Sequence, residues 1–162
     1  MNAIPRRLAF GALYVVVGLL VTTSALLAAD PFVGTWKLNS AKTKYSPGPP
    51  PKNLTITYEA TADGIKATTD GVNAEGKPVA TTYSATYDGK DTPVTGSGAP
   101  YDTIAVKRID PNTVELTTKK DGKVVSKGKR VVSKDGKVMT ITSKGTNAKG
   151  EATNNVAVYD KQ

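Results

Sequence analysis

The chain has 162 residues, with 22 basic and 14 acidic side chains and a formal net charge of +8. It contains neither cysteine nor histidine, which excludes disulfide bonds, thiolate and imidazole catalysis and the commonest zinc sites. The length suits one domain preceded by a short leader.

Residues 1–29 have the pattern of a bacterial secretory signal peptide. Arg6 and Arg7 form a positive start, and no charged residue occurs from Leu8 to Ala29. The segment ends in small residues, as a cleavage site requires. We therefore expect an N-terminal signal helix that is removed, and a periplasmic or secreted domain of residues 30–162. An uncleaved membrane anchor is the alternative, because the uncharged run is long enough to span a bilayer.

Turn motifs divide the rest of the chain at regular intervals. An acidic residue followed by glycine suits a two-residue hairpin loop, because both positions tolerate a positive φ. The runs between these steps are rich in Thr, Val, Ile and Tyr and are too short for crossover helices, so neighbouring runs should pair as antiparallel strands. The glycine steps are Asp63–Gly64, Asp70–Gly71, Glu75–Gly76, Asp88–Gly89, Asp121–Gly122, Asp135–Gly136 and Lys149–Gly150.

Alternation of apolar and polar residues locates the strands. Leu54, Ile56 and Tyr58 face one side of their run, with threonines on the other, as in a half-buried antiparallel sheet. The proline-rich stretch Asn39–Lys52 predicts a stiff, extended connection. In chain order, the predicted strands are Val33–Leu38, Asn53–Thr61, Ile65–Asp70, Pro78–Tyr87, a short one at Asp91–Thr95, Thr103–Ile109, Thr113–Lys119, Val124–Ser133, Val138–Lys144 and Ala152–Tyr159.

The predicted fold class is all-β: an antiparallel up-and-down meander of 8–10 strands closed into a barrel. Closure follows from the edges, because an open meander of this length would leave two rows of unpaired backbone groups. A flat open sheet or a two-layer sandwich is the alternative.

The segment from Phe32 to Leu38, with glycine at position 34 and tryptophan at position 36, resembles the Gly-x-Trp first strand of the calycin superfamily, which includes the lipocalins and fatty-acid-binding proteins. The ending Val156–Lys161 is similar to the terminal strand of fatty-acid-binding proteins. The resemblance extends over most of residues 32–161. It implies a bacterial secreted lipocalin-like barrel with Gly34 and Trp36 as its structural motif and Trp36 packed across the closed end.

Two departures from the family patterns bear on the site. Fatty-acid-binding proteins carry an arginine two residues before the tyrosine of the last strand, and this chain has Ala157 there. The proline-rich loop also leaves no room for their two-helix lid. Lipocalins place an arginine over the tryptophan, and Arg108 or Arg130 is expected to cover Trp36.

The candidate ligand-binding residues are two arginines and four tyrosines. Arg108 and Arg130 lie within predicted strands, and a planar guanidinium can bind a carboxylate or phosphate through two hydrogen bonds. Their alternatives are a structural role over the tryptophan, a cross-strand ion pair or plain exposure. Amphipathic rings could line a cavity, or they could be ordinary core residues. These rings are Tyr58, Tyr83, Tyr87 and Tyr159.

No pattern predicts a catalytic centre, a metal site or a cofactor. Most acidic residues lie beside glycine in turns, without the spacing of a calcium loop, and no serine has a histidine partner for a hydrolase triad. The basic residues are not interleaved with aromatics as in a nucleic-acid-binding surface. We therefore expect a protein that is not an enzyme and does not bind nucleic acid.

Together these features predict an exported, non-enzymatic binding protein that holds a small hydrophobic or amphipathic ligand in a β-barrel. Membrane contact would come only through an uncleaved leader. The alternative is a structural or protein-interaction module of the cell envelope with a solid barrel core, which would use its lysine-rich and threonine-rich surface or a sheet edge.

Overall fold

The computed structural model describes residues 29–162, and all its regular structure in this part is β-strand. The predicted signal helix and the alternative of a membrane anchor fall on the first 28 residues, outside the described part. Residues 29–162 contain no helix that is long and apolar enough to cross a bilayer. The domain boundary at residue 30 stays a prediction.

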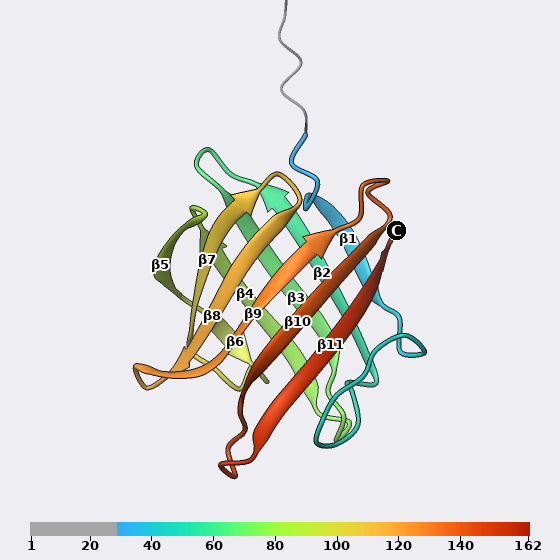
Figure 1. Cartoon of the computed structure of the whole chain (residues 1–162), viewed down its shortest axis with the longest axis vertical. Helices are drawn as coiled ribbons and strands as arrows, with labels where there is room; N and C mark the ends of the chain where they lie inside the picture. Colours follow the sequence, from blue (N-terminus) through green and yellow to red (C-terminus); the bar gives the residue numbers. More distant parts are fainter. Residues whose placement is uncertain (1–28) are drawn as a thin grey trace, which may run out of the picture.

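Eleven strands form one antiparallel sheet (Figure 1). They are β1 (Gly34–Leu38), β2 (Asn53–Ala60), β3 (Ile65–Val72), β4 (Pro78–Ala85), β5 (Asp88–Pro93), β6 (Thr95–Ser97), β7 (Thr103–Asp110), β8 (Thr113–Lys120), β9 (Lys123–Val132), β10 (Val138–Thr146) and β11 (Ala152–Lys161). The all-β antiparallel meander is therefore confirmed, with eleven strands instead of the 8–10 expected.

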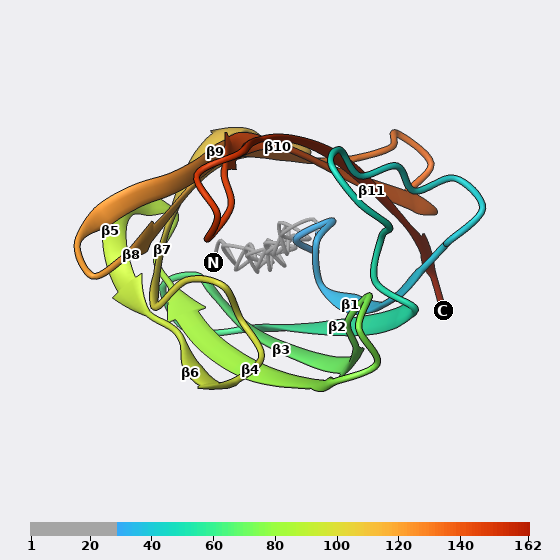
Figure 2. The same cartoon turned by 90° about the horizontal axis from the view of Figure 1, so that it is seen from below.

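The first strand pairs with the last, which curls the sheet into a barrel (Figure 2). Trp36 lies opposite Lys161, and Leu38 lies opposite Tyr159. The other edge of β1 pairs with β2, so this short strand joins the two ends of the meander. The predicted meeting of first and last strands is confirmed.

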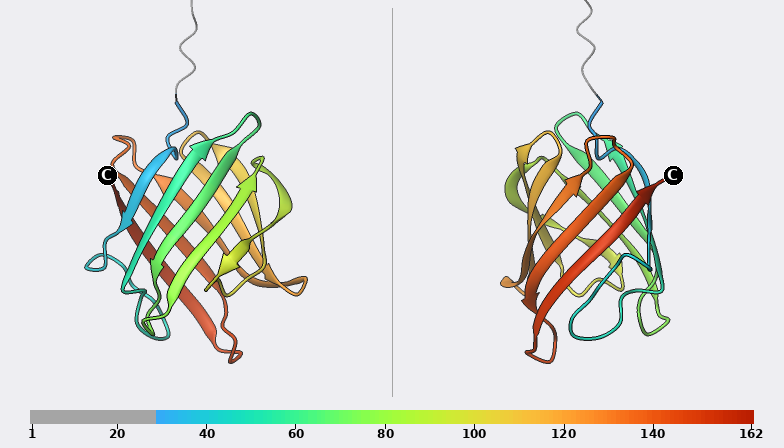
Figure 3. Two further views of the ribbon diagram at one scale, coloured as in Figure 1. Left: turned by 180° about the vertical axis from the view of Figure 1, so that it is seen from behind. Right: turned by 45° about the vertical axis from the view of Figure 1, so that its right-hand side comes forward.

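The barrel is nearly closed instead of fully closed. Strand β5 pairs with β7 and β6 pairs with β4, and the two strands are the edges of the sheet. Between β4 and β5 the chain turns at Tyr87, which has a φ of 60°. The predicted single strand Asp91–Thr95 is wrong. Strand β5 ends at Pro93, and the next strand, β6, begins at Thr95 on the opposite edge of the sheet (Figure 3, left).

Two of the predicted glycine turns are also wrong. Asp70–Gly71 lies within β3, where it continues the ladder with β2, and Asp88–Gly89 lies within β5. The turn after β3 is made by Asn73, whose side-chain oxygen accepts the backbone N–H groups of Glu75 at 3.0 Å and Lys77 at 2.9 Å. The same turn contains the predicted step Glu75–Gly76, where Gly76 has a φ of 84° and donates its N–H to the Asn73 carbonyl at 3.2 Å. A short amide side chain and a glycine therefore form this turn together.

Large apolar side chains fill the end of the barrel drawn uppermost in Figure 1, which we call the upper half. The segment before β1 enters the ring of strands here (Figure 2). Its residue Phe32 is fully buried, and the Phe32 carbonyl accepts the indole N–H of Trp36 at 2.8 Å. The predicted place of Trp36 in the core is confirmed. The largest of the fully buried side chains are Phe32, Trp36, Tyr58, Ile65, Val106, Val114, Val132 and Met139.

The expectation of an arginine over Trp36 is wrong. Lys161, opposite Trp36 in the ladder, places its ammonium 5.1 Å from the centre of the indole ring. A lysine at this position covers the ring as a cation–π partner. Because β11 brings position 161 directly beside β1, no side chain from β7 or β9 is needed there.

The lower half of the barrel has a different lining. Following the alternation of each strand downward from the buried core, the inward-facing side chains become small, mostly polar and partly exposed. Solvent therefore reaches the inner surface from this end. These residues are Thr69, Gly71, Thr81, Ser126, Gly128, Ser143, Gly145, Thr153 and Asn155. The barrel is therefore filled by large side chains above and lined by small, partly exposed side chains below, and we call these parts the packed half and the open half.

Replacing Trp36 by alanine should lower the free energy of unfolding by about 3–5 kcal/mol, because it removes a fully buried ring and leaves a cavity. Denaturant-induced unfolding followed by circular dichroism measures the change. The control is Lys37→Ala, whose side chain is exposed on the same strand and should change stability by less than about 0.5 kcal/mol. Equal stabilities for the two variants would contradict the role assigned to Trp36.

Candidate functional site

A buried arginine lies at the boundary between the packed and open halves of the barrel. Arg130 comes from β9, where it pairs with Val114 of β8 and Ile141 of β10. Its side chain faces inward and the residue is 3% exposed. One guanidinium nitrogen, Nη2, donates a hydrogen bond of 2.9 Å to the hydroxyl of Tyr83 on β4. This bond spans the interior of the barrel.

Aromatic rings surround the Arg130 guanidinium. Its central carbon lies 4.7 Å from the ring centre of Tyr58 and 6.0 Å from that of Phe32. The charge of Arg130 also acts on the buried hydroxyls of Tyr101 and Tyr159. We call Arg130 with Tyr58, Tyr83, Tyr101 and Tyr159 the arginine–tyrosine cluster. It combines one cation with four amphipathic rings.

The cluster leaves part of the arginine without a hydrogen-bond partner. The Nε and Nη1 atoms of Arg130 are buried, and neither has a partner among residues 29–162. No carboxylate in this part of the chain forms an ion pair with Arg130. A guanidinium stays protonated even when it is buried, so an uncompensated positive charge with free donors points into the interior. This arrangement is costly for the fold.

Burial also acts on the tyrosines of the cluster. It raises the pKa of Tyr101 to about 12, with a smaller contribution from Tyr83, against the opposing effect of Arg130. Burial raises the pKa of Tyr58 and of Tyr159 in the same direction. These hydroxyls therefore remain protonated donors at neutral pH, and the cluster can offer hydrogen bonds beside its positive charge.

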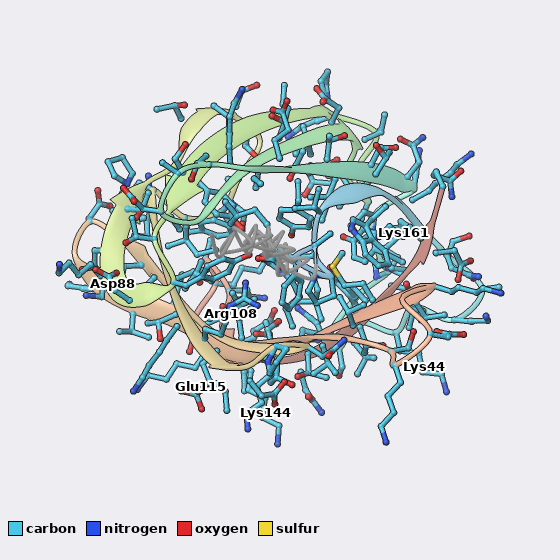
Figure 4. All side chains as sticks on the ribbon, turned by 90° about the horizontal axis from the view of Figure 1, so that it is seen from above. Lys44, Asp88, Arg108, Glu115, Lys144 and Lys161 are labelled. Carbon is cyan, nitrogen blue, oxygen red and sulfur yellow. The ribbon has the colours of Figure 1, made fainter. Side chains whose placement is uncertain are left out.

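Arg108, labelled in Figure 4, belongs with Tyr87 to a second cluster at the upper end. Arg108 forms an ion pair with Asp30 and donates a hydrogen bond of 2.9 Å to the carbonyl of Pro111. Its guanidinium lies 3.8 Å from the ring centre of Tyr87, whose hydroxyl donates to Asp30 at 2.9 Å. Together these contacts hold the segment that carries Phe32 in the barrel end, so Arg108 is engaged structurally.

The structure thus divides the predicted ligand-binding residues into two groups. Arg130, Tyr58, Tyr83 and Tyr159 lie in one cluster, while the other two predicted residues hold Asp30. Ligand contact by any of them stays a prediction. Ala157 stands at the position where fatty-acid-binding proteins carry an arginine. It lies opposite Ile141 of β10, which in turn lies opposite Arg130 of β9.

Sequence reasoning missed Tyr101 and Tyr45. Both lie outside the named strands, so no alternation predicts their direction. Tyr45 packs against the core because Lys44 continues the ladder of β11 by bridging to Val156. Tyr101 enters from the connection between β6 and β7 and packs against the same core. An aromatic residue among proline and glycine was the sole clue to either contact.

The groups of the cluster are suited to binding an anion. The cluster offers a fixed cation, hydroxyl donors and apolar ring faces, which together suit an anionic group attached to an apolar body. Within residues 29–162, no group of three or more histidine, cysteine, aspartate or glutamate side chains could hold a metal ion.

Comparison with known proteins identifies the fold. No protein-family model matches the sequence, and a search of curated proteins finds no relative. Among solved structures, the chain is similar to the zebrafish ileal bile acid-binding protein in complex with cholic acid, with a TM-score of 0.53 and 16% sequence identity. The match covers 82% of this chain and 99% of that one. The fold of the described domain is therefore calycin-like.

Raising the pH from about 10, the ordinary pKa of tyrosine, to about 12 should destabilise the protein. The unfolded chain loses the Tyr101 proton near the lower value, whereas the folded protein keeps it up to the higher one. The contribution of the Tyr101 proton to the free energy of unfolding is therefore fully present below pH 10, and it is lost as the pH rises to about 12. A pKa difference of about two units corresponds to about 2–3 kcal/mol.

Denaturant unfolding at a series of pH values, compared with Tyr101→Phe, measures this effect. The variant should show a shallower loss of stability. Ultraviolet titration of tyrosinate provides the second measurement, because the buried tyrosines should ionise only as the protein unfolds. Ionisation of all tyrosines near pH 10 without loss of structure would contradict the buried cluster.

Proposed function

We propose that this chain is an exported, non-enzymatic binding protein that takes a small amphipathic molecule into the open half of its barrel. Arg130 would hold the anionic group of that molecule. The observation that carries the proposal is the burial of this guanidinium with two nitrogens free of hydrogen bonds. A carboxylate or sulfonate would accept both the charge and the free donors.

The energetics of the cluster favour an anionic ligand over a neutral one. A charge buried without a partner costs several kcal/mol, whereas the same charge paired with an anion recovers most of that cost. Hydrogen bonds that involve charged groups contribute about 1.5–3 kcal/mol each. The affinity of the site should therefore depend strongly on the charge of the ligand.

The lining of the lower half favours a ligand that is apolar in part. Leu54, Ile141, Tyr45 and Val94 pack partly exposed against the core, beside inward-facing threonine, serine and asparagine side chains. Such a mixed surface suits a compact body with its own hydroxyl groups better than an unbranched alkyl chain. Cholic acid, the ligand in the similar zebrafish structure, has this chemistry, and we choose it as the first probe.

A ligand has to displace a side chain to reach Arg130, because the residue is almost fully buried. Tyr101 is the candidate, since it lies in the connection from β6 to β7 and not in a strand. The next residue, Asp102, is held by backbone hydrogen bonds to Val94 and to Lys119 of β8, so the movement would be confined to the part of the connection before it. The cluster would then open on ligand entry and close over the anionic group.

Arg130→Met should weaken the binding of cholate by at least about tenfold, because the charged hydrogen bonds are lost. Isothermal titration calorimetry measures the affinity, and the uncharged methyl ester of cholate serves as a second ligand. Wild type should prefer the anion, and the variant should bind both ligands with similar low affinity. Removal of an unpaired buried charge should leave the stability of the ligand-free protein unchanged or higher.

The matched control is Arg108→Met, which removes the other arginine of the described domain. It should lower the melting temperature, because Asp30 loses its ion-pair partner, while cholate affinity stays within about twofold. Equal loss of affinity in the two arginine variants, or wild-type affinity in Arg130→Met, would refute an anion site at Arg130.

Export predicts a defined mature end. Intact-mass measurement of the protein from its native host should give a chain that begins at Asp30, because the small residues before it suit signal peptidase. The Asp30 carboxylate would then be the first side chain of the mature protein and would hold its start to Arg108 and Tyr87. A full-length chain in the membrane fraction would instead establish the anchor.

A further inference from the structure

The outer face of β7–β11 carries a group of neighbouring lysines. Five lysines project outward from β7, β9, β10 and the segment that extends the sheet beyond β11. We call them the lysine face; Figure 4 shows two of them, Lys44 and Lys144, on the same side of the barrel as Glu115. They are Lys44, Lys107, Lys127, Lys129 and Lys144.

The strand register places these lysines in two neighbouring rows. In the first row Lys107 lies opposite Glu115, which lies opposite Lys129. The row continues through one threonine and one valine to Lys44. In the second row Lys127 lies directly opposite Lys144. The first row crosses five strand spacings, or about 24 Å.

The charge on this side is compensated only in part, by Glu115 between Lys107 and Lys129. None of the five lysines forms an ion pair with a carboxylate of residues 29–162, and like charges directly opposite each other across strands are destabilising. The outer face of β1–β4 differs, because there Lys66 pairs with Glu59 at 3.3 Å. The repulsion between Lys127 and Lys144 is a cost that an anionic partner would remove.

The lysine face is hollowed at its centre. Lys127, Lys129 and Lys144 line a shallow, open depression on β8–β11, together with one acidic side chain, Glu115, and with hydroxyl and amide side chains. Thr117, Thr142 and Asn154 supply these groups. No aromatic residue lines the depression, so it offers no surface on which a nucleobase or a sugar ring could stack. Ammonium, hydroxyl and amide donors match the oxygen atoms of phosphates.

We propose that the lysine face binds a linear polymer of phosphate groups, which lies across the strands from β7 to β11. The first row of lysines crosses five strand spacings, or about 24 Å, which suits an extended chain. The spread of lysines over two rows also requires several anionic groups at regular intervals, which a single small anion does not provide. This site is separate from the inner cluster and does not depend on the proposed function.

Fluorescence anisotropy with labelled inorganic polyphosphate tests the proposal. The variant K127Q/K129Q/K144Q should bind at least about tenfold more weakly than wild type, because it loses three cations from the hollow. The control K37Q/K66Q/K77Q removes the same net charge from other parts of the surface and should stay within about twofold of wild type. Arg130→Met should bind the polymer as wild type does.

Further arms of the experiment separate the alternatives. Orthophosphate at matched phosphate concentration should compete poorly, and phosphatidylglycerol vesicles should bind more weakly than the polymer. Binding to the vesicles alone would overturn the proposal in favour of a lipid surface. Equal losses of affinity in the two triple variants would also overturn it, because binding would then depend only on the net charge of the protein. Unchanged melting temperatures verify that both variants are folded.

Discussion

The pairing of β1 with β11 is the contact on which the rest of the molecule depends. It joins the two ends of the meander and sets Trp36 beside Lys161, so that the ring and its covering cation come from opposite ends of the domain. The lower part of β11 continues past β1 and pairs with the segment at Lys44, whose amide donates to the Val156 carbonyl at 2.8 Å. This extension brings Tyr45 against the core. Closure thus determines both the packed end and part of the lining of the open one.

The size of the inward-facing side chains, rather than the path of the backbone, divides the barrel into a filled and an open half. On β9 the inward positions change from Ser126 and Gly128 to Arg130 and Val132, and the burial of the side chains changes with them. A side chain is sterically impossible at Gly128, because a Cβ atom there would lie 1.8 Å from the Thr142 carbonyl oxygen. The wall next to Arg130 is therefore kept bare by the close approach of two strands.

The sequence predicted local features well, but it did not predict contacts between residues that are far apart in the chain. Alternation located the strands, and it placed Arg108 and Arg130 within strands, because strand patterns depend on neighbouring positions alone. The partners of these arginines depend on which strands meet across the barrel. Tyr83 is 47 residues from Arg130, and Asp30 is 78 residues from Arg108, so no local pattern could distinguish the engaged arginine from the free one. The turn after β3 was predicted from Glu75–Gly76, whereas the hydrogen bonds that the Asn73 side chain adds to it were not.

The distribution of cations follows the same physical logic as the two proposed sites. Of the two arginines in the described domain, one is nearly buried and the other half-buried, whereas the lysines of the outer face are exposed. A guanidinium is more weakly hydrated than an ammonium and stacks on aromatic rings, so it tolerates a position among tyrosines where a lysine would lose its proton. Lysine in turn suits an exposed face, where a mobile point charge can follow a flexible anionic chain. A single sheet separates the interior of the barrel from its outer face. The two proposed sites therefore share no side chains, and they would not compete for the same anion.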